Sequence, residues 1–139
     1  MYIYKVKVDR VVDGDTIDCT IDLGFSIFHK ARVRLYGIDT PESRTRDPDE
    51  KLRGKLASSF IKDKLSATET HAIATKLDAK GKFGRVLGVL ICDDENVNEQ
   101  LIQNDLAVEY FGQSKEAIEQ QHLENRKRLI EKGAYRPPL

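Results

Sequence analysis

The stretch from Val11 to Gly24, VVDGDTIDCTIDLG, determines how the first part of the chain folds. It contains the alternation of apolar and polar side chains that is typical of a strand with one buried face; the apolar positions are Ile17, Cys19, Ile21 and Leu23. Val11 and Val12 interrupt a similar alternation in the segment before, which predicts a β-bulge just before Asp13. We therefore expect two strands that meet at Asp13-Gly14-Asp15.

The remaining chain alternates between strand-like and helical segments. Three more strands are predicted over 31–35, 71–77 and 86–92, and the last is apolar enough for burial on both faces. Helical spacing predicts one helix after Pro48, a short one over 99–103 with Asn98 as N-cap and Asn104-Asp105 at its end, and a long one from Ser114 to about Lys132. Five short strands with three helices predict an α+β fold, a five-stranded β-barrel of the OB type with three α-helices packed outside.

Length and composition agree with one globular domain over residues 1–139. Lys and Arg together number 23, and so do Asp and Glu, so the formal net charge is zero. The net charge therefore gives no indication of a nucleic-acid partner. No apolar stretch is long enough to cross a bilayer, and no export signal is visible, so we expect no membrane partner. A cytoplasmic protein is the simplest interpretation, and a secreted or periplasmic one would follow if a signal had been removed. Cys19 and Cys92 lack metal-site or paired spacing and are expected to be buried free thiols.

A second motif follows the third predicted strand, VRLYGIDTPE from Val33 to Glu42. Two strand ends in one small barrel can bring Asp15 and Asp39 together, and two carboxylates that close repel each other unless a cation lies between them. Their oxygens, with the Thr40 carbonyl, suit a hard divalent cation such as Ca²⁺. Arg34 lies on the polar face of its strand, where its planar guanidinium could bind a phosphate.

These residue types together suit phosphodiester hydrolysis. Glu42 lies two residues beyond Thr40, where it could hold or deprotonate an attacking water. Arg85, after a glycine, could reach the same phosphate from another side, and guanidinium groups stabilise the extra negative charge of the transition state.

Each motif taken alone has a simpler interpretation. An Asp-Gly-Asp triplet is typical of a tight hairpin turn, and an Asp before Thr-Pro often begins a turn. Arg85 could be a surface arginine that closes a hairpin, and the basic residues from Lys51 to Lys55 could form a solvated helix face.

The combination of motifs resembles the staphylococcal nuclease (thermonuclease) family over almost the whole chain. The matching segments occur in the family's order, with similar spacing: Val12-Asp13-Gly14-Asp15-Thr16, Arg34 to Glu42, Lys82-Phe83-Gly84-Arg85, Val97-Asn98-Glu99, Leu106-Ala107 and Gln121-His122-Leu123.

The resemblance implies a role for each matching residue. Asp15, Asp39 and Thr40 would bind Ca²⁺, with Asp13 near the metal, and Glu42 would hold the attacking water as the proposed general base. Arg34 and Arg85 would bind the scissile phosphate. The residues that would contact the nucleotide are Lys82, Phe83, Tyr110 and Phe111.

The activity implied by this resemblance is a Ca²⁺-dependent endonuclease. It would cleave single-stranded DNA and RNA with little sugar specificity, leave 3′-phosphate ends and act as a monomer. The alternative is a non-catalytic nuclease-like module that binds nucleic acid or protein.

Three departures from the prototype stand out. The chain is neutral where the prototype is basic, and weaker, more salt-sensitive nucleic-acid binding would follow. Phe83 replaces a tyrosine, and Tyr135 replaces a tryptophan as a predicted packing anchor. His29, His71 and His122 match no catalytic position and are expected to be structural or surface residues.

Overall fold

The fold was obtained as a computed structural model that describes residues 2–76 and 85–138. The elements are β1 (Tyr2–Asp13), β2 (Thr16–Asp22), β3 (Phe28–Leu35), β4 (Ile38–Asp39), α1 (Pro48–Ala67), β5 (His71–Lys76), β6 (Arg85–Cys92), β7 (Glu95–Asn96), α2 (Val97–Gln103), β8 (Val108–Glu109) and α3 (Lys115–Glu131).

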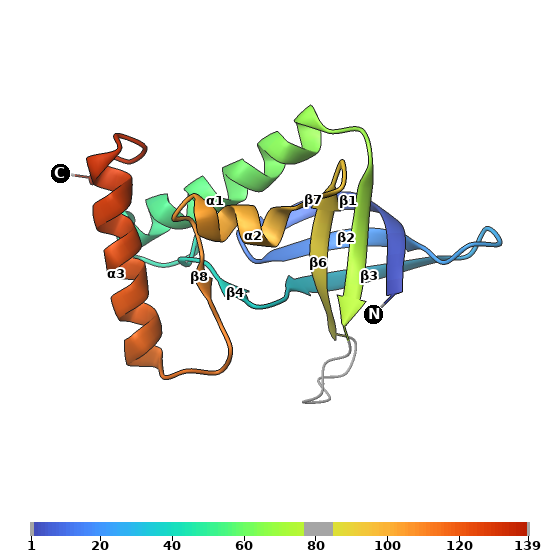
Figure 1. Ribbon diagram of the computed structural model, residues 1–139, viewed down its shortest axis with the longest axis horizontal. Helices are drawn as coiled ribbons and strands as arrows, with labels where there is room; N and C mark the ends of the chain where they lie inside the picture. Colours follow the sequence, from blue (N-terminus) through green and yellow to red (C-terminus); the bar gives the residue numbers. More distant parts are fainter. Residues whose placement is uncertain (1, 77–84, 139) are drawn as a thin grey trace.

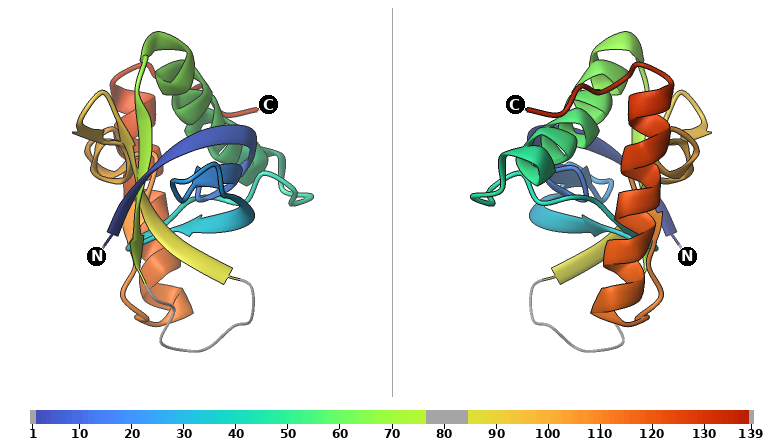
Figure 2. Two further views of the ribbon diagram at one scale, coloured as in Figure 1. Left: turned by 90° about the vertical axis from the view of Figure 1, so that its right-hand side faces the viewer. Right: turned by 90° about the vertical axis from the view of Figure 1, so that its left-hand side faces the viewer.

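Five of the strands form a closed barrel (Figures 1 and 2). The sheet order is β3-β2-β1-β5-β6, and a parallel pairing between β3 and β6 closes it. The two-residue strand β7 extends the sheet beside β6, and β4 pairs separately with β8. The predicted α+β fold, an OB-type barrel with three helices, is confirmed, while β4, β7 and β8 were not foreseen because each spans only two residues.

The barrel interior contains the alternating apolar residues of the strands. Ile17, Val33 and Leu35 are fully buried where β2 and β3 pair, and Ile61 of α1 covers one end of the same core. The expected bulge before Asp13 is confirmed by shifts in the β1–β2 register between Val8 and Arg10 and between Val11 and Asp13. Bulges bend a strand and increase its twist, and the second shift lies directly before the Asp13-Gly14-Asp15 turn.

The helices begin at side chains that cap their free backbone amides. Asp47 caps α1, and its carboxylate accepts from the amides of Asp49 and Glu50. Ser114 caps α3 as predicted, and its hydroxyl accepts from the amide of Ala117. Figure 1 shows α3 at the end of the molecule opposite the β2–β3 hairpin, with β4 and β8 between α3 and the barrel.

The predicted start of the short helix is wrong. Asn96, not Asn98, caps α2 by accepting from the amide of Glu99 at 3.0 Å. Asn98 is buried, and its side chain accepts from the amide of Leu90 and donates to the carbonyl of Gly88. An amide that satisfies the barrel backbone cannot also cap the helix, and this could not be read from the one-dimensional pattern.

Predictions about single buried residues are mostly confirmed. Cys19 and Cys92 are buried free thiols, and Tyr135 is buried with its hydroxyl donating to the carbonyl of Asp49 at 3.3 Å. Strand β6 is buried on both faces only in part, because Leu90 is fully buried whereas Val89 is half-buried. In the described ranges, no helix has the length and apolar character needed to cross a membrane.

Candidate active site

The Asp13-Gly14-Asp15 turn is packed against the first helix and the second motif. A Cβ atom added to Gly14 would lie 2.5 Å from the Ala57 Cβ and 2.9 Å from the Thr40 Oγ1, so only glycine fits here. The backbone of Gly14 does not have a positive φ. The glycine is therefore required for close packing rather than for an unusual turn conformation, and this packing brings the Asp15 side of the turn next to Thr40.

The β2–β3 register places Arg34 beside this turn. Thr16 pairs with Arg34, and the amide of Leu35 donates to the carbonyl of Asp15 at 2.8 Å. The guanidinium Nη1 of Arg34 lies 3.1 Å from Asp15 Oδ2, and Nη2 lies 3.6 Å from Asp39 Oδ1. One guanidinium thus contacts both aspartates that are predicted to bind the metal.

Asp39 reaches this position through a bend and a short strand pair. Gly37 has a φ of +77°, a left-handed conformation that glycine adopts without strain. The following strand β4 pairs with β8, with Asp39 opposite Val108. The amide of Thr40 then donates to Asp15 Oδ2 at 3.3 Å, which links the two motifs directly. The predicted meeting of Asp15 and Asp39 is therefore present in the structure.

The donor set fits a hard cation. Asp15 and Asp39 bring two negative charges to the one positive charge of Arg34, so the three side chains retain a net negative charge that favours a cation. Within residues 2–76 and 85–138, no three His, Cys, Asp or Glu side chains form a metal-binding cluster. With the Thr40 carbonyl as the predicted third ligand, water and substrate oxygens would have to complete the coordination, which Ca²⁺ accepts.

Glu42 lies on the loop between β4 and α1. Its side chain is exposed, and it lines a cleft of about 810 Å³ together with Asp39, Thr40 and His122. The loop is packed against α1 at Gly54, where an added Cβ would lie 2.7 Å from the Pro41 carbonyl oxygen and 2.8 Å from the Glu42 carbonyl carbon. Contact with this glycine fixes the backbone that carries Glu42.

Among the residues that the structure describes, Asp13 has no hydrogen bond or ion pair to another predicted site residue. Its carboxylate accepts a hydrogen bond from the hydroxyl of Ser43, the residue after Glu42. In this structure Asp13 therefore holds the Glu42 loop to the turn, and its predicted position near the metal stays a prediction.

The residues predicted to contact the nucleotide differ in how the structure places them. Tyr110 lines the cleft beside Asp39, and its amide donates to the Gly37 carbonyl at 2.8 Å. Phe111 is largely exposed and lies against Gly37. Lys82 and Phe83 lie outside the described residues.

Arg85 begins β6, and its backbone pairs in parallel with Arg32 of β3. This pairing places the Arg85 backbone beside Arg32, two residues before Arg34 on β3. The role of its side chain stays a prediction.

The structure adds a residue that the sequence analysis did not connect with the site. Nε2 of His122 lies 2.7 Å from Asp39 Oδ2. His122 belongs to α3 and is separated from Asp39 by 83 residues, so no local pattern could indicate the contact. The one available signal was that Gln121-His122-Leu123 matches a segment of the family, and this match assigned no role to His122.

Comparisons with known proteins show the family of this chain. The family model described as "Staphylococcal nuclease homologue" matches residues 32–134. Endonuclease YhcR of Bacillus subtilis is 38% identical over 114 residues, which cover 78% of this chain and 9% of that protein. Thermonuclease of Staphylococcus intermedius is 36% identical over 104 residues, covering 75% of this chain and 57% of that protein.

The chain matches only part of the length of these relatives, less than two thirds of each. The family model, however, spans most of the chain, from the middle of β3 to the residue before Tyr135. It includes Arg34, Asp39, Thr40, Glu42 and Arg85, while Asp15 lies before the matched range and joins them through the contacts described above. This chain belongs to the staphylococcal nuclease homologue family.

Proposed function

We propose that this chain is a Ca²⁺-dependent endonuclease that hydrolyses phosphodiester bonds in single-stranded DNA and RNA. The observation that carries the proposal is the Arg34 guanidinium held between Asp15 and Asp39, beside a cleft lined by Glu42. The family resemblance supports hydrolysis of phosphodiesters, and the two carboxylates support a hard cation as cofactor.

The proposed chemistry assigns a role to each predicted catalytic residue. Arg34 and Arg85 bind the non-bridging oxygens of the scissile phosphate and stabilise the charge that grows on them in the transition state. Glu42 positions a water and accepts its proton as the water oxygen attacks phosphorus. The bond from phosphorus to the 5′ oxygen breaks, this oxygen takes up a proton from solvent, and the products are a 3′-phosphate and a 5′-hydroxyl.

Asp15, Asp39 and the Thr40 carbonyl would hold the Ca²⁺. When bound, the ion supplies Lewis-acid polarisation of a phosphoryl oxygen. Arg34 contacts both carboxylates in the absence of substrate. It can therefore exchange part of this pairing for a bidentate contact to phosphate when a nucleic acid binds.

Digestion of end-labelled single-stranded DNA and RNA oligonucleotides in Ca²⁺, Mg²⁺ or EDTA, with mapping of the product ends, tests the proposal. We expect cleavage of both substrates in Ca²⁺, 3′-phosphate ends, and little turnover in Mg²⁺ or EDTA. Mg²⁺ requires a tight octahedron and releases its waters reluctantly, so it would draw the carboxylates inward. Displacements of about 1 Å can cost on the order of 10²-fold in rate.

Three outcomes would contradict the proposal. Full activity in Mg²⁺, or 5′-phosphate ends in Ca²⁺, would exclude the assigned mechanism while leaving a nuclease. Nucleic-acid binding without cleavage in any metal would favour the non-catalytic module.

A further inference from the structure

We propose that His122 is a positioning residue, which holds the Asp39 carboxylate in the orientation needed for the metal. The inference rests on the proposed function, because it assigns a partner to the carboxylate that would bind Ca²⁺. It concerns a residue on α3, outside the two motifs that contain the metal ligands.

The contact between the two side chains is short and partly shielded from water. His122 Nε2 lies 2.7 Å from Asp39 Oδ2, and the His122 side chain is 13% exposed. Because a carboxylate oxygen accepts, the imidazole donates through Nε2–H. Within the described chain, the Nδ1 atom of His122 is buried and has no hydrogen-bond partner. The ring is therefore oriented by its contact with Asp39 and not by a competing polar group.

The two oxygens of Asp39 have different surroundings. Oδ2 accepts the short hydrogen bond from His122, whereas Oδ1 lies 3.6 Å from Arg34 Nη2, beyond ordinary hydrogen-bond distance. Fixing Oδ2 limits rotation of the carboxylate and leaves Oδ1 on the side of Arg34 and Asp15. Partners of this kind orient ligating carboxylates in metal sites.

The backbone of Asp39 needs such a restraint. Strand β4 contains only two residues, so few backbone hydrogen bonds hold the end of the chain where the carboxylate is attached. His122 approaches from a separate element and contacts the side chain directly. A site held from two elements keeps its geometry better than one held by a short strand alone.

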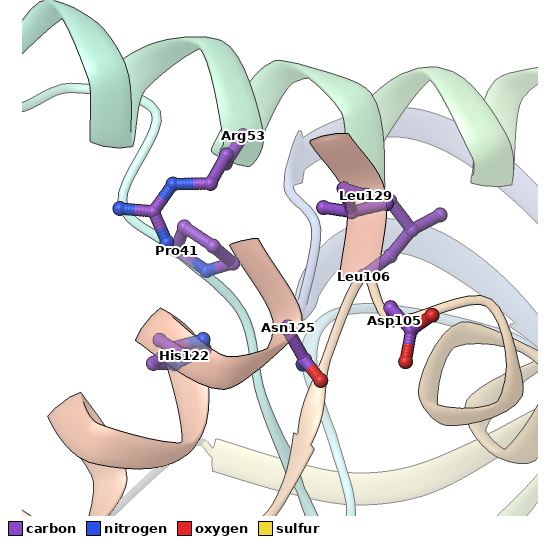
Figure 3. A pocket seen from close by; sticks show the side chains of 7 residues that line it. All are labelled: Pro41, Arg53, Asp105, Leu106, His122, Asn125 and Leu129. Atoms are coloured by element: carbon purple, nitrogen blue, oxygen red, sulfur yellow. The ribbon is translucent and has the colours of Figure 1, made fainter. Parts of the chain in front are cut away.

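Helix α3 is itself fixed close to His122. Asn125, one turn further along, is buried and donates to the Ala107 carbonyl at 3.0 Å. Arg126 donates to Asp49 Oδ2 of α1 at 3.0 Å. Figure 3 shows the Arg53 side chain directed from α1 toward Pro41, with His122 on α3 near the same loop. The imidazole is thus presented by a helix that is anchored to Ala107, the residue before β8, and to α1.

The test compares two substitutions of equal length, His122→Gln and His122→Met. Glutamine retains a nitrogen donor at the end of the side chain, and methionine has a similar size without a donor. The calcium dissociation constant is measured by titration calorimetry with CaCl₂, and kcat and KM are measured on a single-stranded oligonucleotide over a range of calcium concentrations. His29→Met, at an exposed position on β3, is the control.

We expect His122→Met to weaken calcium binding by about 10- to 100-fold, the loss typical of removing a partner of a metal ligand. His122→Gln should restore most of that affinity, and His29→Met should match the unaltered protein. Activity of His122→Met should recover as calcium is raised, because the metal itself then orders Asp39. If His122→Met does not fold, as judged by its melting temperature without metal, His122→Leu takes its place.

The outcomes separate this inference from the proposed function. If the unaltered protein binds calcium, and His122→Met and His122→Gln both bind it with the same affinity as the unaltered protein, the role of His122 alone is overturned. Equal weakening in both variants would also overturn it, because the donor would then be irrelevant. Absence of calcium binding in the unaltered protein would overturn both the inference and the proposed function.

Discussion

Arg32 and Arg34 lie two residues apart on the same face of β3, and each pairs with an aspartate near β2. Arg32 makes a two-point contact with Asp18, at 2.8 and 3.1 Å, and its side chain is 60% exposed. Arg34 makes longer contacts, at 3.1 Å to Asp15 and 3.6 Å to Asp39, and is 20% exposed. The better-formed ion pair is therefore the surface one. What distinguishes Arg34 is partial burial and a second carboxylate, not ideal pairing geometry.

The difference arises from the chain around the two arginines. Opposite Arg32, strand β2 simply continues, and the pair is surrounded by solvent. Opposite Arg34, β2 begins at Thr16 directly after the Asp13-Gly14-Asp15 turn, and the chain beyond β3 bends at Gly37 toward β4. The end of the strand pair is thus the place where a second acidic residue can reach the same guanidinium.

We expect the largest difference between Arg32 and Arg34 in the catalytic activity of their lysine variants. We expect Arg34→Lys to lower kcat by about 10²-fold or more, because an ammonium group cannot reproduce a two-point contact with phosphate. Arg32→Lys should leave kcat nearly unchanged, since its partner is a surface carboxylate. Steady-state cleavage of a single-stranded oligonucleotide measures both variants, and near-normal turnover of Arg34→Lys would remove it from the site.

The aspartates that contact Arg34 and the aspartate that contacts Arg32 should differ in their effect on calcium affinity. Asp15→Asn and Asp39→Asn each remove a negative charge from the proposed site, and we expect the calcium dissociation constant to rise about tenfold or more, as affinity follows the number of charged ligands. Asp18→Asn, which removes the same charge from the surface pair, should have no effect. Calorimetric titration decides, and unchanged affinity in both site variants would place the metal elsewhere.

The packing behind the site can be tested at Gly54. An added methyl group gains roughly 1 kcal/mol of helix propensity, but it would lie 2.7 Å from the Pro41 carbonyl oxygen. Because overpacking costs typically about 1–3 kcal/mol, we expect Gly54→Ala to lower the free energy of unfolding by about 1 kcal/mol and to reduce kcat by moving Glu42.

Urea unfolding and the cleavage assay measure both effects of Gly54→Ala. Ser59→Ala, at an exposed position of the same helix, should be neutral or slightly stabilising. A more stable Gly54→Ala protein with full activity would show that the loop moves freely.

The smallest effect belongs to the surface pair. The hydrogen bond from Arg32 holds the pKa of Asp18 below its ordinary value of 3.8. A carboxyl group with a lowered pKa in the folded state contributes stability above pH 4 and loses it as the pH falls through the folded-state pKa. The pair is solvent-exposed, so we expect Asp18→Asn to cost less than about 1 kcal/mol at pH 7. Unfolding of both proteins at pH 7 and pH 3 should show this difference shrink in acid, and an unchanged difference would contradict the pairing.

Local patterns in the sequence predicted the elements that contain the site. The period-two alternation of Ile17, Cys19 and Ile21 identified β2 and its buried face. The bulge before Asp13 and the cap at Ser114 were also predictable, because strand pleat, bulge and helix cap each depend on neighbours a few residues apart. The same patterns put Asp15, Arg34 and Asp39 at strand ends, where they could meet.

Tertiary structure decided which polar groups contact each other. Asn98 looked like a helix cap and instead bonds the barrel backbone at Leu90 and Gly88. His122 looked like a surface or structural residue and instead contacts Asp39 across 83 residues. A buried polar group forms a hydrogen bond with a partner that the folded chain brings within reach. Leaving the group unpaired would cost free energy, so the folded state keeps this hydrogen bond. Periodicity in the sequence determined the strands of the barrel. The packing of distant segments determined which groups contact Asn98 and Asp39.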